Sequence, residues 1–137
     1  MRVLIRADMG GEHGMGHAVR CLALANALRK KKIETQFCTQ TPSLKSYVNH
    51  AGFDCYEPSK SYRSPLEETF VIDTKANDWA NDDEILAHMH DNGRKIVRID
   101  HPHAAPDSCD LLIAPCAHWS TDTVASLRQL FGERFLY

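Results

Sequence analysis

Residues 3–28 read VLIRADMGGEHGMGHAVRCLALANAL, and this stretch determines the fold class. Val3–Arg6 is a short aliphatic run that leads to Asp8, as expected of a buried first strand. Four of the chain's seven glycines then fall within residues 10–16. From about Gly16 to Lys31 the apolar residues follow a helical pattern, and they are so dense that we expect this helix to be covered on more than one face.

The same alternation of strand and helix continues along the chain. Further strands are expected at residues 34–38, 54–58, 69–73, 95–100 and 109–114. One helix is expected between Thr41 and Gly52, and another between Asn81 and Gly93. Nearly continuous apolar strands that alternate with helices predict an α/β fold with a doubly wound, mostly parallel, Rossmann-like sheet. With 137 residues, the chain is expected to form one such domain over residues 1–137.

The composition excludes several classes of protein. A net charge of −2 and a pI near 6.4 argue against a nucleic-acid partner. No apolar run reaches the roughly 18 residues of a membrane span, so no membrane partner is expected. The five cysteines form no CxxC pair, which favours reduced thiols and a cytoplasmic location. The histidines and cysteines of the second half lack the spacing of familiar zinc sites, so no metal site is predicted.

Acidic side chains and the glycine loop fall at corresponding places in the predicted fold. Asp8, Asp73 and Asp100 each follow a predicted strand. Ligands of doubly wound sheets bind beyond the carboxyl ends of the strands. We therefore expect these three carboxylates and the loop to form one site.

The glycine loop is neither a dinucleotide fingerprint nor a phosphate-binding P-loop. Val19 stands where the third glycine of GxGxxG would lie, and no GK[ST] follows. What remains is a loop of small residues, Gly14 and Gly16 among them, that leads into a helix N-terminus. Such a loop lets a ligand approach backbone N–H groups whose dipole favours negative charge.

His17 and Arg20 lie in the first turns of this helix. The helix dipole disfavours an imidazolium at His17, and a neutral ring at the mouth of a crevice is suited to accept a proton from water or a hydroxyl. The alternative is a histidine that only caps or packs. Arg20, one turn later, either clamps a phosphate or carboxylate or pairs with Asp8.

The sequence RADMGGEHGMGHAVRCLALANAL resembles the start of the UDP-sugar hydrolases of pseudaminic acid biosynthesis, and more distantly the glycine loop of the lipid II-forming N-acetylglucosaminyltransferase. Both families have the two-domain GT-B architecture, which makes this chain similar to its N-terminal domain. The later segments VIDTK, KIVRID and SCDLLIAP are also similar to the hydrolases. Arg6, Asp8, Gly14, Gly16 and Arg20 fall on the family's motif.

The resemblance implies a hydrolase that cleaves UDP from a UDP-diacetamido-trideoxy-hexose, with a UDP-sugar or sugar-phosphate as its ligand. His17 matches the family's general base for water. Asp8, Gly14, Gly16 and Arg20 are then candidate substrate-binding residues, together with three residues at the later strand ends: Asp73, Lys75 and His101. No cofactor and no metal are expected.

The chain departs from the family at three points. Lys75 replaces a tyrosine near the sugar, and His101 replaces a second aspartate. The second, nucleotide-binding GT-B domain is absent from these 137 residues. We therefore expect the isolated chain to be inactive, and surface that would meet the second domain suggests a homodimer.

Two other functions are compatible with the same residues. One is the acceptor-binding half of a GT-B glycosyltransferase, in which His17 deprotonates an acceptor hydroxyl. The other is a non-catalytic module that binds a sugar-phosphate.

Overall fold

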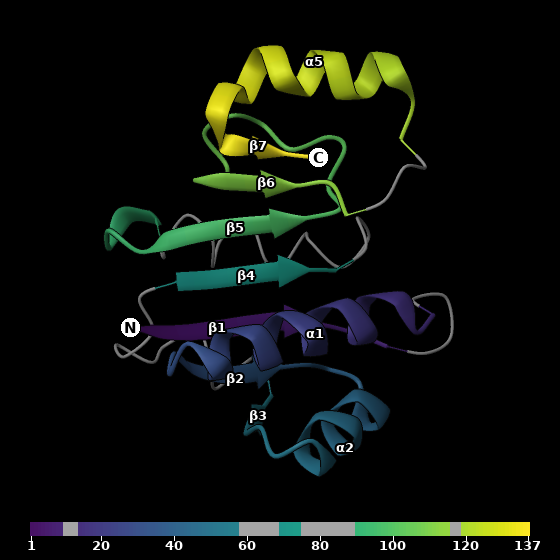
Figure 1. The fold of residues 1–137 in the computed structure, drawn as a ribbon, viewed down its shortest axis with the longest axis vertical. Helices are drawn as coiled ribbons and strands as arrows, with labels where there is room; N and C mark the ends of the chain where they lie inside the picture. Colours follow the sequence, from purple (N-terminus) through teal and green to yellow (C-terminus); the bar gives the residue numbers. More distant parts are fainter. Residues whose placement is uncertain (10–13, 58–68, 75–89, 116–118) are drawn as a thin grey trace.

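The computed structural model describes residues 1–9, 14–57, 69–74, 90–115 and 119–137. The strands are β1 (Arg2–Ala7), β2 (Glu34–Cys38), β3 (Cys55–Tyr56), β4 (Thr69–Asp73), β5 (Lys95–Ile99), β6 (Leu111–Ile113) and β7 (Phe135–Leu136). They form one seven-stranded sheet in the order β3-β2-β1-β4-β5-β6-β7 (Figure 1). Every neighbouring pair is parallel, which confirms the predicted α/β, Rossmann-like fold.

Three helices connect strands within the described part of the chain. They are α1 (Gly16–Lys30), α2 (Pro42–His50) and α5 (Thr121–Phe131), and a short 3₁₀ turn, η3 (Gly132–Arg134), follows the last of them. The first two were predicted from their sequence pattern. The helix expected between Asn81 and Gly93 lies mostly outside the described residues.

Helix α1 is buried along a single stripe. Ala18, Cys21 and Ala25 are fully buried, whereas Val19 is 53% exposed. The expectation of a helix covered on more than one face is therefore wrong. The stripe consists of small side chains, which let the helix lie close to the sheet while its leucines remain only partly buried.

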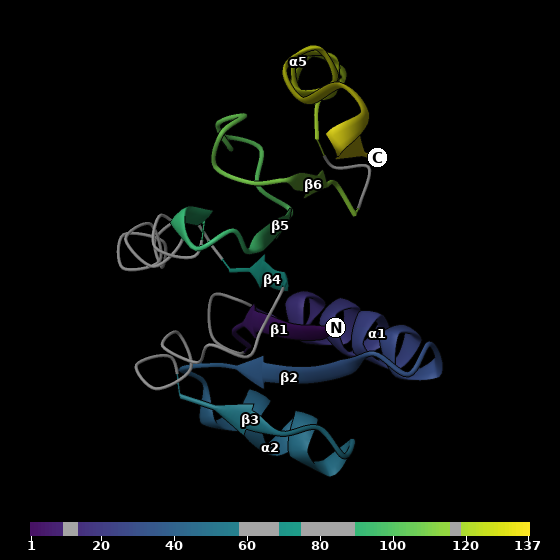
Figure 2. The same cartoon turned by 90° about the vertical axis from the view of Figure 1, so that its left-hand side faces the viewer.

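Side chains alternate along each strand and form a core on each face of the sheet. Val3, Ile5 and Val71 pack with α1 and α2 on one face. Leu4, Phe70, Ile72 and Leu112 pack with α5 on the other face. Figure 2 shows the sheet nearly edge-on, with α1 on one side of β1 and β2.

Helix α5 and strand β7 were not predicted. The hydroxyl of Ser120 accepts a hydrogen bond from the backbone N–H of Thr123 and caps the helix. Val124, Leu127 and Phe131 then form the buried stripe at helical spacing. The cap and the apolar spacing together are a helix signal that the sequence does carry.

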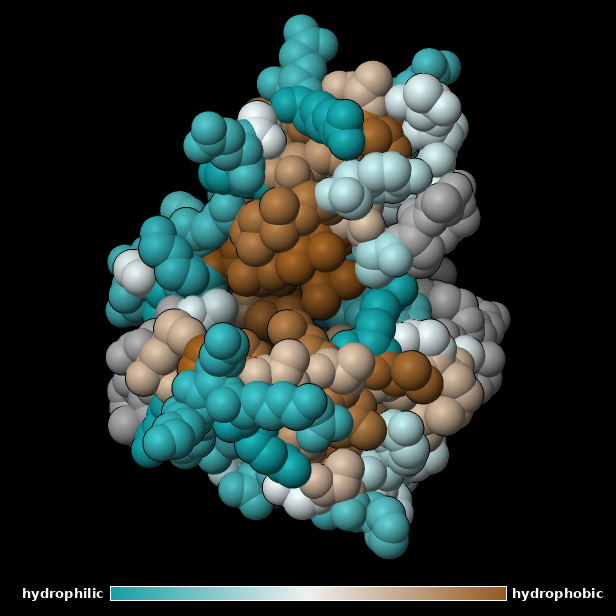
Figure 3. All heavy atoms as spheres, viewed as in Figure 1, coloured by the Kyte–Doolittle hydropathy of each residue, from teal (hydrophilic) through white to brown (hydrophobic). Residues whose placement is uncertain are grey.

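On the face of the sheet that carries α1, the strands β5, β6 and β7 expose apolar residues. Val97 pairs with Leu111, and Ile113 pairs with Leu136, along rows that face the same side as α1. Leu136 is 51% exposed, and Figure 3 shows a hydrophobic area over β5 and β6. None of the described helices lies over this area (Figure 1).

Candidate functional site

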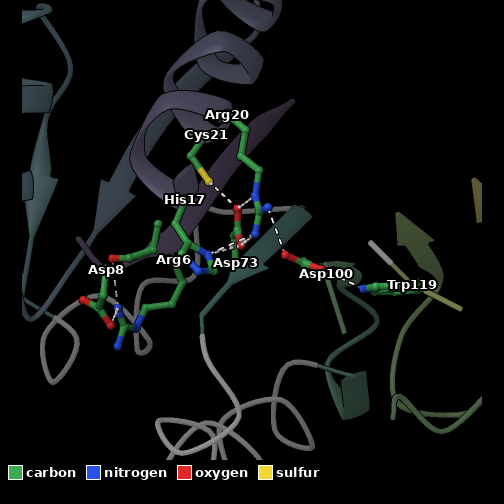
Figure 4. A network of polar contacts seen from close by, with 9 residues as sticks. Arg6, Asp8, His17, Arg20, Cys21, Asp73, Asp100 and Trp119 are labelled. Atoms are coloured by element: carbon green, nitrogen blue, oxygen red, sulfur yellow. Dashed lines mark hydrogen bonds and ion pairs between the residues drawn. The ribbon is translucent and has the colours of Figure 1, made fainter. Parts of the chain in front are cut away.

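Two networks of polar side chains lie at the carboxyl edge of the sheet (Figure 4). The Asp8 network consists of Arg6, Asp8, Thr39, Gln40 and Thr41. The His17 network consists of His17, Arg20, Cys21, Asp73, Asp100 and Trp119.

The Asp8 network links the end of β1 to the residues that follow β2. Nη1 of Arg6 lies 2.7 Å from one oxygen of Asp8, and both side chains are almost completely buried. The other oxygen accepts hydrogen bonds from the Thr39 hydroxyl at 2.8 Å and the Gln40 backbone N–H at 3.0 Å. Burial raises the pKa of Asp8, but the contacts with Arg6 and Thr39 outweigh it and lower that pKa below its usual value.

The His17 network begins where α1 meets the end of β4. His17 is in the first turn of α1, and Asp73 is the last residue of β4. Nδ1 of His17 lies 2.5 Å from Oδ1 of Asp73. The His17 side chain is 13% exposed, whereas the Asp73 side chain is fully buried. The carboxylate of Asp73, which is buried, thus holds the His17 ring, which is partly accessible to solvent.

Arg20 joins Asp73 to Asp100. Its Nε contacts Oδ2 of Asp73, and its Nη2 lies 2.5 Å from Oδ1 of the same carboxylate. Its Nη1 lies 3.0 Å from Oδ2 of Asp100. Burial lowers the pKa of Arg20, but the two carboxylates outweigh this and raise it, so the guanidinium stays charged.

These contacts define the tautomer of His17. Nη2 of Arg20 also lies 3.0 Å from Nδ1 of His17, where it could donate only to an unprotonated Nδ1. An unprotonated Nδ1 would place its lone pair 2.5 Å from the ionised carboxylate of Asp73, which has no proton to donate, and this shorter contact decides between the two. The short contact between Nδ1 and Asp73 therefore requires a proton on Nδ1, which the ring donates to the carboxylate. Nε2 is then the nitrogen that can accept a proton.

Asp73 remains ionised and Cys21 remains a thiol. Burial raises the pKa of Asp73, but hydrogen bonds from Arg20 and His17 outweigh it and lower that pKa. Burial and the Asp73 charge both raise the pKa of Cys21 well above its usual value. Cys21 accordingly donates its S–H to Oδ2 of Asp73 at 3.3 Å and does not act as a nucleophile.

Asp100 connects the network to the segment before α5. It follows β5 with a φ of 61°, in the left-handed region that aspartate and asparagine tolerate better than most residues. Its Oδ1 accepts a hydrogen bond from the indole N–H of Trp119 at 3.0 Å. The Trp119 ring stacks on Phe135 of β7, with centroids 6.4 Å apart.

The structure brings part of the predicted site together. His17, Arg20, Asp73 and Asp100 meet in one network, whereas Asp8 belongs to the neighbouring one. The alternative in which Arg20 pairs with Asp8 is wrong, because Arg6 occupies that carboxylate.

The remaining predicted residues have different outcomes. Gly14, with a φ of 63°, and Gly16 lead directly into the turn that carries His17. Lys75 lies outside the described residues. His101 was expected to face the crevice, but it is only 6% exposed. Burial and the nearby charge of Arg98 lower its pKa to about 3.

Two members of the His17 network were assigned only packing roles from the sequence. Cys21 was interpreted as a small core residue, and it is buried, but it also donates to Asp73. Its position four residues after His17, on one side of α1, was a usable signal. Trp119 was interpreted as a packing residue. Its contact with Asp100 joins two residues that are 19 positions apart, and the sequence gives no signal for that pairing.

Three other features were sought in the described part of the chain: a metal cluster, a membrane-spanning helix and a groove. No group of three or more His, Cys, Asp or Glu side chains there is arranged to hold a metal ion. Among the same residues, no helix has the length and apolar character needed to cross a bilayer. A groove of about 470 Å³ between α5 and residues 102–104 contains no member of the His17 network.

Fold and site together define the class: a Rossmann-like α/β domain with a histidine–aspartate pair at the carboxyl edge of its sheet. Comparisons of the chain with protein-family models, with curated proteins and with solved structures give no match.

Proposed function

We propose that this chain is the N-terminal, base-bearing domain of a nucleotide-sugar hydrolase of pseudaminic acid biosynthesis that cleaves UDP from a UDP-diacetamido-trideoxy-hexose. The observation that carries the proposal is the 2.5 Å contact between Nδ1 of His17 and Asp73, which leaves Nε2 as the proton acceptor. The resemblance of residues 6–28 to that family supplies the substrate class.

In the proposed reaction, Nε2 of His17 takes a proton from water while the water oxygen bonds to the anomeric carbon of the sugar. The bond between that carbon and the phosphate oxygen breaks, and UDP leaves with the electron pair. Asp73 keeps the ring oriented and compensates the positive charge that it gains. The products are the free sugar and UDP.

The charges of the His17 network support a role in proton transfer over a role as a phosphate clamp. Asp73 and Asp100 together engage all three nitrogens of the Arg20 guanidinium. These two carboxylates already offset the single positive charge of Arg20, which leaves it no net attraction for a diphosphate. We therefore expect the cations that hold the UDP diphosphate to lie elsewhere, which agrees with a nucleotide site on a second domain.

The test is an assay of UDP release in H₂¹⁸O, with the chain alone and with the chain fused after Tyr137 to the C-terminal domain of a hydrolase of this family. We expect negligible turnover by the chain alone and one ¹⁸O in the free sugar released by the fusion. His17→Ala in the fusion should lower kcat by roughly 10²–10⁴-fold, the usual contribution of a general base. His50→Ala, at the exposed end of α2, is the matched control and should leave kcat unchanged.

Other outcomes contradict the proposal. A glycoside formed from an added sugar acceptor, with no ¹⁸O in a free sugar, would favour the glycosyltransferase, because Nε2 can deprotonate a hydroxyl as well as water. Binding of the UDP-sugar that is equal in the parent and His17→Ala fusions, with turnover in neither, would favour a non-catalytic sugar-phosphate module.

A further inference from the structure

Asp100 has an unusual backbone conformation and two partners from distant parts of the chain. Its φ of 61° directs the side chain between α1 and the segment before α5 (Figure 4). One oxygen lies 3.0 Å from Nη1 of Arg20, and the other accepts the indole N–H of Trp119, also at 3.0 Å. A left-handed conformation in a non-glycine residue persists when surrounding contacts hold it.

A charge count shows what Asp100 adds to the His17 network. Asp73 and Asp100 each contribute one negative charge, and Arg20 contributes one positive charge. With a neutral His17 ring, the network therefore carries one surplus negative charge. That surplus equals the charge that His17 gains when it accepts a proton. Without Asp100, the protonated network would hold an uncompensated positive charge at a partly buried site.

We propose that Asp100 is a positioning residue, which holds Arg20 against Asp73 and supplies the negative charge that stabilises His17 in its protonated form. The proposal deepens the function given above and rests on it for the catalytic role of His17. Trp119 has a smaller part, because it holds the Asp100 carboxylate in place without changing the charge.

Among the described residues, the other charged groups near His17 on α1, β1 and β4 do not supply this charge. The Cys21 thiol on α1 is neutral at ordinary pH. At the end of β1, Arg6 and Asp8 form a pair whose charges cancel. On β4, the charge of Asp73 is matched by Arg20.

The test measures the protonated fraction of His17 by imidazole ¹⁵N NMR at one fixed, mildly acidic pH, on the chain without substrate. Asp100→Asn removes the charge and also the contact with Arg20, because the amide oxygen keeps accepting from Trp119 while the NH₂ group faces Nη1 of Arg20, which can only donate. Asparagine tolerates the left-handed region, so the backbone conformation is kept. We expect the ratio of protonated to neutral His17 to fall by roughly 3–10-fold. Asp91→Asn, which makes the same charge change just before β5 at the opposite edge of the sheet, should change the ratio less than about twofold.

Trp119→Phe keeps the stacking on Phe135 and the charge of Asp100 but removes the indole donor. We expect a smaller fall in the ratio than for Asp100→Asn, together with at least a roughly fivefold faster exchange of the Arg20 guanidinium protons, since the Asp100 carboxylate is less well held. If Asp100→Asn does not fold, unchanged exchange in Trp119→Phe overturns the proposal. An equal fall in the two variants also overturns it, because the charge would then not be the cause.

Activity separates this proposal from the proposed function. In the active fusion, Asp100→Asn should lower kcat by about the same 3–10-fold and leave KM unchanged, because the charge acts on the proton that His17 gains. Absence of UDP release contradicts the hydrolase alone, since the NMR measurement needs no substrate. An unchanged His17 ratio in folded Asp100→Asn contradicts the positioning role whatever the activity.

Discussion

The Asp8 and His17 networks use the same pair of residue types, an arginine and an aspartate, at the same edge of the sheet, but they differ in their access to solvent. The Arg6 and Asp8 side chains are 0% and 4% exposed. The His17, Arg20 and Asp100 side chains are 13%, 22% and 17% exposed above the buried Asp73. The Asp8 network is therefore closed to solvent, and the His17 network is open to solvent on one side.

The difference separates a structural ion pair from a candidate site. In the Asp8 network, hydroxyl and backbone N–H groups complete the contacts of the carboxylate, and the cluster joins the ends of β1 and β2. In the His17 network, the Asp73 carboxylate accepts a hydrogen bond from Nδ1 of His17, and Nε2 of the same ring can act on a ligand. Substitutions in the first network should therefore act on stability, and those in the second should act on chemistry.

The largest expected effect comes from Asp73→Asn in the active fusion. Nε of Arg20 and the Cys21 thiol both donate at the Oδ2 position, so the amide oxygen should occupy it and the NH₂ group should face Nδ1 of His17. This arrangement favours the tautomer with its proton on Nε2. The ring could then no longer accept a proton there, so kcat should fall by roughly 10²–10⁴-fold. Steady-state kinetics of folded Asp73→Asn provide the measurement, and a kcat within about threefold of the parent would show that Asp73 does not control the base.

The next effect is on stability and concerns the closed network. Asp8→Ala leaves the Arg6 guanidinium buried without its carboxylate, and breaking a buried pair from one side costs about 3 kcal/mol or more. Urea denaturation should detect this loss in the free energy of unfolding. Glu34→Ala, which breaks the exposed pair of Arg2 and Glu34, is the control and should cost less than about 1 kcal/mol. Equal losses in the free energy of unfolding of the two variants would mean that the buried pair of Arg6 and Asp8 stabilises the fold no more than an exposed pair.

The fold could be predicted from local sequence patterns for a physical reason. The run TFVID and the run KIVRI are continuous apolar strands, and a parallel sheet buried on both faces requires this pattern. The extent of burial of α1 could not be predicted in this way. Its leucines suggest cover on several sides, but its depth depends on the distance to the sheet, which Ala18 and Ala25 determine in three dimensions.

The candidate site was predictable only at the level of the sheet edge. Parallel strands bring Asp73 and Asp100 to the same edge, and the glycine loop brings His17 there. Which arginine pairs with which aspartate depends on the face to which each side chain points. Arg6 lies in the register row of Ile72, on the face opposite to Asp73, so it pairs with Asp8 and leaves Asp73 to Arg20.

A smaller effect is expected on the pH dependence of stability, and it comes from the buried His101. His101 is buried near Arg98, and its pKa is lowered to about 3 from about 6.5 in an unfolded chain. Between these values the unfolded state binds a proton that the folded state does not, so stability falls as pH falls from about 6.5 towards 3. At pH 5 the loss should be about 2 kcal/mol relative to pH 7.

Urea denaturation of the parent and of His101→Gln at the two pH values checks this expectation. The variant should lose the part of the pH dependence that comes from His101, whereas His50→Gln, at an exposed histidine, should retain it. If the free energy of unfolding of His101→Gln falls as much as that of the parent between pH 7 and pH 5, the buried imidazole is not the source of the pH dependence.

The smallest expected effect tests how the glycine loop delivers His17 to the open network. Gly14 has a φ of 63°, and an added Cβ would meet no atom within 4 Å, so Gly14→Ala adds only backbone strain, about 1 kcal/mol. Gly16 also has open space around it but no positive φ, and Gly16→Ala should leave stability unchanged or raise it by a few tenths of a kcal/mol. If instead both variants lower the free energy of unfolding equally, crowding and not conformation limits this turn.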